Sequence, residues 1–120
     1  PVFFADLDWK LLMKTIRNQA VKYTEISKFP AVSRDLALLI DQSVEFGRIE
    51  QIAYQTEKKL LKAVTLFDVY EGKNLPAGKK SYAVNFILQD TEKTMSEKAI
   101  DAIMQKLIQQ LTKQLGAELR

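Results

Sequence analysis

The chain of 120 residues contains neither cysteine nor histidine. Without cysteine there can be no disulfide and no thiolate chemistry, which is typical of proteins from a reducing compartment. Without histidine the sequence lacks the commonest general base, the commonest metal ligand and the usual side chain that titrates near neutral pH. Zinc sites and serine-nucleophile catalysis lose their usual partners, so the composition argues against both.

Long apolar runs are absent as well, and no stretch approaches the roughly 20 residues of a membrane-spanning helix. The first residues do not form a basic and then apolar signal peptide, and a chain that begins with Pro1 is expected to be a fragment or a processed product. Hydrophobic residues make up 47% of the chain and charged residues 28%, as in soluble globular proteins. The net charge of +3 permits an anionic partner without requiring one.

The beginning of the chain differs in character from the rest. Leu7, Leu11 and Ile16 recur at near-helical spacing, and no clear period follows up to the Phe29-Pro30 pair. We therefore expect residues 1–27 to be a tail or linker and residues 28–120 to form one main domain.

The main domain contains strand and helix patterns in a regular order. Alternating apolar residues predict the strands, and apolar residues at helical spacing predict the helices. Thr94 and Glu97 have the spacing of a capping box at the start of the second helix, and Gly116 is its expected stop. A glycine- and proline-containing loop over residues 71–79 predicts a hairpin. The order is strand, helix, strand, strand, helix, strand, over residues 32–41, 45–62, 63–70, 80–89, 94–115 and 117–120.

This order is the βαββαβ pattern of a ferredoxin-like α+β sandwich. Each helix has a single apolar stripe, so both helices are expected to cover the same face of a four-stranded antiparallel sheet. The other face of the sheet would stay open. We further expect the first and third strands to run side by side and parallel.

Alternation along the strands predicts which side chains lie on the open face. In the first and third strands the large apolar residues point to the helices, which leaves Ala37, Ser81 and Ala83 outward. In the second strand the penalty for burying a charge places Asp68 outward, together with Tyr70. These five residues predict a floor of small side chains with one acid and one aromatic ring at its edge.

Two further predictions follow from the same alternation. Phe67 and Val69 flank Asp68 and are expected in the core. Leu39, Leu66 and Ile87 are expected to form an apolar patch at the far end of the open face. Such a patch needs a cover, which residues 1–27 or a parent protein would supply.

A flat floor beside a carboxylate suits a planar ligand that carries hydrogen-bond donors. Guanine presents its N1–H and its exocyclic amine side by side, and one carboxylate accepts both, while an aromatic neighbour stacks on an unpaired base. Cations nearby would hold phosphates and leave base selection to the acid. The candidate cations are Lys28, Arg34, Lys73, Lys79 and Lys80. The alternatives are structural: Arg34 pairs with Asp35, and Asp68 pairs with a lysine of its own hairpin.

Three other classes of protein share the predicted fold. An RNA-recognition motif would carry exposed aromatic rings on the first and third strands, where this chain has Ala37, Leu39, Ala83 and Asn85. An acylphosphatase-like hydrolase needs an arginine in the loop after the first strand, and residues 41–44 offer none. A small-molecule-binding regulatory or dimerisation module remains the main alternative.

Four stretches carry a family resemblance: FPAVSRDLALLID, LFDVYEG, GKKSYAVNFILQD and LGAELR. Together they resemble the ferredoxin-fold anticodon-binding domain that ends the β subunit of bacterial phenylalanyl-tRNA synthetases, over about residues 28–120. The resemblance implies that the open face binds the phenylalanine anticodon stem-loop, whose anticodon begins with G. It also implies base contacts by Asp68, Tyr70, Ser81 and Ala37.

The resemblance carries expectations about a parent enzyme too. Aminoacylation with ATP and magnesium would belong to the α subunit, the expected partner in a cytoplasmic heterotetramer. This chain is expected to hold no catalytic residue and no cofactor, and to bind tRNA rather than DNA or a membrane. The stretch FFADLDWKLLMK resembles the end of the preceding catalytic-like module of the same subunit, retained here as a tail.

Overall fold

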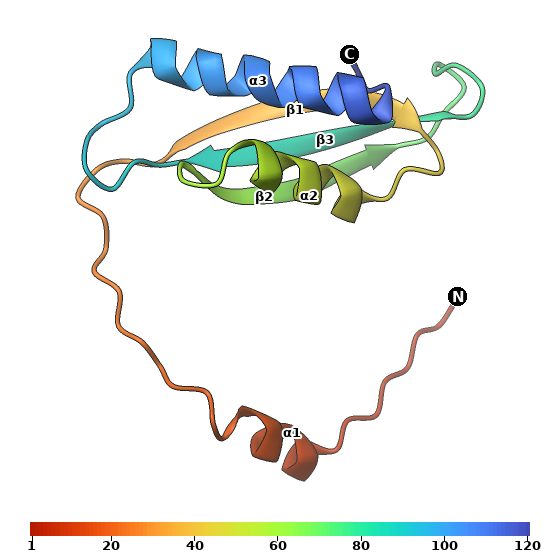
Figure 1. Cartoon of the computed structure of the whole chain (residues 1–120). Helices are drawn as coiled ribbons and strands as arrows, with labels where there is room; N and C mark the ends of the chain where they lie inside the picture. Colours follow the sequence, from red (N-terminus) through yellow and green to blue (C-terminus); the bar gives the residue numbers. More distant parts are fainter.

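A four-stranded sheet with two helices on one face forms the body of the protein, and an arm leads into it (Figure 1). The structure, a computed structural model, describes all residues from 1 to 120. The elements are α1 (Trp9–Ile16), β1 (Val32–Asp41), α2 (Phe46–Thr56), β2 (Leu61–Tyr70), β3 (Lys79–Leu88), α3 (Glu97–Leu115) and β4 (Glu118–Leu119). After the arm the order is βαββαβ, so the predicted ferredoxin-like α+β fold is confirmed.

The strand order in the sheet is β2-β3-β1-β4, and every neighbouring pair is antiparallel. The expectation that β1 and β3 run parallel is therefore wrong. The crossover through α2 makes β1 and β2 parallel, and β3 returns from a hairpin to lie between them in the opposite direction. As a result Ala37 pairs with Ala83, and Leu39 pairs with Ser81.

The hydrophobic core lies between the sheet and the two helices α2 and α3, which share one face of it (Figure 1). Burying one large aliphatic or aromatic side chain stabilises a fold by about 1.5–3 kcal/mol, so the alternation of such residues fixes the face that each strand turns to the helices. The sheet contributes Leu38, Ile40, Leu61, Val64, Tyr82, Val84, Phe86 and Leu88 to this core.

The ends of the helices differ in detail from the predicted ones. Ser96, not Thr94, caps α3, and its hydroxyl accepts a hydrogen bond from the Ala99 amide. The first body helix ends at Thr56 instead of residue 62. There the Glu57 carboxylate accepts the amides of Lys59 and Leu60 at 3.1 Å and turns the chain into β2.

Gly116 closes α3 in the left-handed conformation, with φ of +61°. Its amide donates to the Thr112 carbonyl, and the Thr112 hydroxyl donates to the carbonyl of Ala117. This turn directs the last residues along the edge of β1, where the Arg120 amide donates to the Ala37 carbonyl at 2.9 Å.

The N-terminal arm contacts the body little. Asp8 caps α1 by accepting the Leu11 amide at 3.0 Å, yet no residue of α1 is buried. Every side chain from Pro1 to Ile26 is exposed, so the arm does not cover the open face of the sheet. No helix in the structure has the length and apolar character needed to cross a membrane.

The closing turn of α3 generates a stability prediction. Gly116→Ala forces an L side chain into the left-handed region and should lower the free energy of unfolding by about 1–2 kcal/mol, measured by urea denaturation. Gly47→Ala is the matched control, because a Cβ there meets no atom within 4 Å and φ is negative. A Gly116→Ala variant as stable as the control would contradict the observed cap.

Candidate nucleic-acid interface

A bulge in β2 decides which of its side chains face the open side of the sheet. Tyr70 pairs with Ser81 and Asp68 with Ala83, but the next pair is Leu66 with Val84, so β2 has one extra residue at this point. That residue is Phe67. The bulge keeps Asp68 and Tyr70 outward, as the alternation predicts.

The bulge also overturns two predictions. Leu66 was expected outward, but it pairs with buried Val84 and packs against the core. Phe67 was expected in the core, but 58% of it is exposed. Two consecutive residues, Phe67 and Asp68, therefore turn outward together, because the extra residue shifts the alternation by one position. The prediction for Val69 is also wrong: it pairs with buried Tyr82, but 47% of it is exposed and it does not join the core.

The predicted floor forms across three strands. Asp68, Ala83 and Ala37 make one cross-strand row, and Tyr70, Ser81 and Leu39 make the next. Ser81 lies between larger neighbours and is only 5% exposed. The register thus brings together all five residues that the sequence placed on the floor, although by antiparallel rather than parallel pairing of β1 and β3.

The predicted apolar patch does not form. Leu39 lies beside Ser81 at the end of the sheet that carries Tyr70. Ile87 pairs with Ser33 and Ala63 at the opposite end, and Leu66 belongs to the core side. Antiparallel pairing separates Leu39 from Ile87, because it reverses which ends of β1 and β3 meet.

The Asp68 carboxylate is the one charged group on the floor, and it takes part in no ion pair. One oxygen accepts the amide of Val69 at 2.9 Å, which orients the group. The three ion pairs of the protein are Arg34–Glu97, Lys59–Glu92 and Lys79–Asp41, and none includes Asp68. A lysine of the hairpin does not neutralise this carboxylate, so it can accept donors from a ligand.

Tyr70 stands at the edge of the floor against the hairpin loop. A Cβ placed on Gly72 would collide with the Tyr70 hydroxyl, so any larger residue there would require the Tyr70 ring to shift. The guanidinium carbon of Arg120 lies 5.2 Å from the centre of the same ring. A cation on a tyrosine face at this distance is a favourable contact.

Arg120 is a site residue that sequence reasoning missed. Its amide is bonded to Ala37 on β1, whereas Tyr70 belongs to β2 on the far side of β3. The two side chains meet above the floor because Ala37 and Ala83 do not obstruct them. The contact between Arg120 and Tyr70 depends on two features, the pairing of β4 with β1 and the small size of these alanines. The pairing of β4 cannot be inferred without the fold, so the sequence alone carries too little signal.

The five predicted phosphate-binding cations do not lie together, and Lys28 is exposed where the arm joins the body. Lys73 is exposed on the hairpin loop and has no ion pair, and Lys79 on the open side contacts Asp41 at 3.5 Å. Lys80 is only 7% exposed and places its ammonium 4.5 Å from the Tyr82 ring centre. Lys80 therefore belongs to the helix side of the sheet.

Arg34 also lies away from the floor. It alternates with outward Asp35, pairs with buried Phe86, and bonds the Glu97 carboxylate at the start of α3 at 2.7 Å. The expected structural pair of Arg34 with Asp35 is therefore wrong, because neighbouring residues of a strand point to opposite faces. The prediction that Arg34 contacts the same ligand as Asp68 loses its geometric basis.

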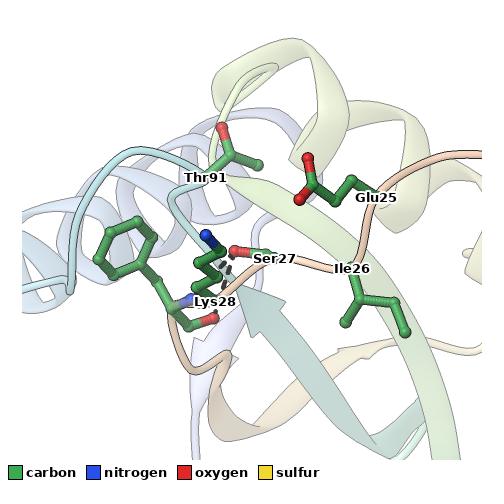
Figure 2. A pocket seen from close by; sticks show the side chains of 6 residues that line it. Glu25, Ile26, Ser27, Lys28 and Thr91 are labelled. Atoms are coloured by element: carbon green, nitrogen blue, oxygen red, sulfur yellow. Dashed lines mark hydrogen bonds between the residues drawn. The ribbon is translucent and has the colours of Figure 1, made fainter.

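A separate hollow lies where the arm joins the body (Figure 2). The Ser27 hydroxyl accepts the Phe29 amide at 3.2 Å, and Gln89 donates to the Phe29 carbonyl at 2.7 Å. These bonds anchor the arm and suggest no ligand chemistry. No group of three or more acidic side chains lies close enough to hold a metal ion.

Comparison with known proteins gives one family and many relatives. A family model described as "Ferredoxin-fold anticodon binding domain" matches residues 27–120. The "Phenylalanine--tRNA ligase beta subunit" of Bacteroides fragilis is 66% identical over 119 residues, which is 99% of this chain and 14% of that protein. The proteins of the same name from Porphyromonas gingivalis and Geobacillus kaustophilus are 54% and 41% identical, over 100% and 86% of this chain.

The chain spans 14% of the length of the Bacteroides relative and 15% of the Porphyromonas one. The part that it matches there is therefore a small piece of each protein. What those longer proteins do as a whole is not a property of the residues described above.

The bulge in β2 can be tested by comparing the stabilities of two variants. Leu66→Ala removes a side chain that packs on the core and should lower the free energy of unfolding by about 2 kcal/mol. Phe67→Ala removes an exposed ring and should change it by less than about 1 kcal/mol. Urea titrations of both variants check this, and the opposite ranking would place Phe67 in the core and remove the bulge.

Proposed function

Because the chain belongs to the ferredoxin-fold anticodon-binding domains, we propose that its open sheet face binds the anticodon loop of a transfer RNA and reads a guanine through Asp68. The observation that carries this proposal is an exposed carboxylate without an ion pair, beside a floor made by Ala37 and Ala83. A carboxylate accepts hydrogen bonds only, so it selects base edges that donate them.

The floor fits an unpaired purine laid flat. Guanine would donate N1–H and its exocyclic amine to Asp68, while the amide of Val69 holds the carboxylate in place. Small side chains at Ala37 and Ala83 leave room for the base. Tyr70 at the edge offers a ring on which the base can stack, a contact worth about 1–3 kcal/mol.

Arg120 has to move when the base stacks on Tyr70. A base between two planes requires a separation of about 7 Å, twice an ordinary carbon–carbon contact, and the guanidinium lies only 5.2 Å from the ring centre. Once displaced, the guanidinium is close enough to the loop to pair with a phosphate, for which its planar fork is suited.

The transfer RNA that we infer is that of phenylalanine. The relatives reported above are named phenylalanine–tRNA ligase β subunits, and a phenylalanine anticodon begins with G, the base that the carboxylate and floor suit. On this proposal residues 28–120 form the anticodon-binding domain of such a subunit, and residues 1–27 are a tail from the module before it. ATP, magnesium, an α-subunit partner in a heterotetramer and a cytoplasmic location then belong to the parent ligase.

Among the predicted cations, phosphate binding is proposed for Lys73 and Lys79 alone. Both project from the open side or the loop next to Tyr70, whereas Lys80 and Arg34 are held on the helix side. Lys79 would exchange its 3.5 Å contact with Asp41 for a phosphate. Electrostatic contacts of this kind supply affinity without selecting a base.

Replacing the carboxylate tests the reading of guanine. Asp68→Asn keeps the shape but presents a donor to N1–H, and it should weaken binding of the phenylalanine anticodon stem-loop by about 1–3 kcal/mol in a fluorescence titration. A loop with inosine at the first position lacks the amine and should lose affinity for the native protein but little more for the variant. Asp101→Asn on α3 is the matched control and should change nothing. An equal loss on a loop that begins with adenosine would show that Asp68 does not read the base.

The placement of the lysines predicts a salt dependence. Lys73→Ala should reduce the slope of log affinity against log salt by about 1, because one phosphate contact is lost. Lys80→Ala should leave that slope unchanged, since its ammonium is turned to Tyr82. Circular dichroism would establish that both variants fold. A reduced slope for Lys80→Ala with none for Lys73→Ala would refute the assignment.

A further inference from the structure

We propose that a second nucleotide, next to the guanine at Asp68, binds on the open face with its base stacked on Phe67 and an exocyclic amine turned to Asn85 and Asp35. This inference rests on the proposed function and extends it to a base edge that Asp68 does not reach. It assigns to the protein a selective subsite for an amine-bearing base. The residues involved lie outside the floor that Asp68 and Tyr70 border.

The bulge is the first observation behind this subsite. Without the extra residue, Phe67 would turn to the helices and add its ring to the core. Instead the bulge directs the ring to solvent, where 58% of it is exposed on the edge strand β2. Bulges commonly re-aim a side chain beside a functional site. An exposed aromatic ring next to a nucleotide-binding floor is a stacking platform that tolerates any base.

A shallow depression lies beside this ring. It has a volume of about 410 Å³ and is lined by Asp35, Thr65, Phe67, Asn85 and Ile87. Thr65, Asn85 and Asp35 form one cross-strand row, and the row of Asp68, Ala83 and Ala37 is the next along the sheet. Ala83 and Asn85 are two residues apart in β3, about 6.6–6.8 Å. The depression therefore lies beside the floor, one row further along the sheet.

The hydrogen bonds of Asn85 determine which edge of a base the depression can recognise. Its side-chain nitrogen donates to Asp35 Oδ1 and to Ser33 Oγ, each at 2.5 Å. An ionised carboxylate accepts only, so Asp35 fixes the orientation of the amide, and both amide hydrogens are used. The groups left for a ligand are the amide oxygen of Asn85 and the second carboxylate oxygen of Asp35.

The free oxygens of Asn85 and Asp35 are acceptors, and they select among ligands, whereas the Thr65 hydroxyl in the same row can donate or accept and does not discriminate. The amines of adenine, cytosine and guanine donate to acceptors, whereas uracil offers one N–H between two carbonyl oxygens that the site would repel. Asp35 takes part in no ion pair, so its charge also rejects a phosphate at this position. The phenylalanine codons UUU and UUC require an adenosine after the first anticodon guanosine, which agrees with the amine that the acceptors demand.

Two modified stem-loops separate this inference from the proposed function. One carries inosine in place of the first anticodon guanosine and tests Asp68. The other carries purine riboside in place of the second anticodon adenosine, which removes the 6-amine and keeps the ring. The 120-residue chain is titrated with each by NMR, which measures affinities from micromolar to millimolar and follows the side-chain amide signal of Asn85 directly.

The expected result is a fivefold or greater loss of affinity for the purine riboside loop and a tenfold or greater loss for uridine at the same position. Phe67→Ala should weaken binding of the unmodified loop roughly 5- to 100-fold, and Phe67→Trp should restore it, because stacking needs only an aromatic face. Asn85→Ala should abolish the discrimination between adenosine and purine riboside. Tyr54→Ala, which removes a partly exposed ring on α2, is the matched control and should have no effect.

The outcomes that would overturn the inference are distinct. If inosine weakens binding but purine riboside and Phe67→Ala do not, the subsite is wrong and the proposed function stands. If the Asn85 amide signal does not shift at saturation, RNA does not occupy the depression, and a cationic protein segment becomes its better occupant. If neither modified loop differs from the native one, or if no loop binds at millimolar concentration, both the subsite and the proposed function are wrong.

Discussion

The pairing of β3 between β1 and β2 is the constraint on which the open face depends. Each cross-strand row of that face takes one side chain from each of these strands, so a slip of one residue in either pairing would exchange its outward set for its buried set. Core side chains such as Val84 and Phe86, which are fully buried on the other face, hold the register. The core therefore positions the outward residues without touching them.

The pairing of β2 with β3 is irregular at two places, at Lys62 and at Phe67, and the bulge at Phe67 is the one beside the floor. In an uninterrupted β2, burying Leu66 would bury Asp68 as well, because the two share a face, whereas turning Asp68 outward would bury Phe67 and expose Leu66. One extra residue lets Leu66 enter the core while both Phe67 and Asp68 face outward. An acid and an aromatic ring that adjoin in sequence thus serve the same surface, which regular alternation forbids.

Several features of the fold and the floor could be predicted from sequence because they depend on local patterns. The strict alternation of β3 placed Ser81 and Ala83 correctly, and the penalty on a buried charge placed Asp68. The same alternation also indicates that Lys80, which is adjacent to outward Ser81, faces the helices. Lys80 should therefore not have been grouped with the loop lysines. Its ammonium lies against Tyr82 instead of the floor.

Other features could not be read from local patterns. Leu66 and Phe67 are both apolar, so hydrophobicity does not say which one the bulge expels. The contact of Arg120 with Tyr70 joins residues 50 positions apart, and it arises only when β4 pairs with β1. The direction of β1 relative to β3 follows from the path of the chain through α2 and the hairpin, which is a property of the whole topology.

The methyl groups of Ala37 and Ala83 report most directly on the central claim, which is that this floor receives a base. In a complex of the methyl-labelled protein with the phenylalanine anticodon stem-loop, both methyl groups should show nuclear Overhauser effects to protons of the first anticodon guanosine. The methyl groups of Ala53 and Ala99 on the helices should show none. Effects confined to the helix alanines, with Ala37 and Ala83 unchanged, would contradict the account.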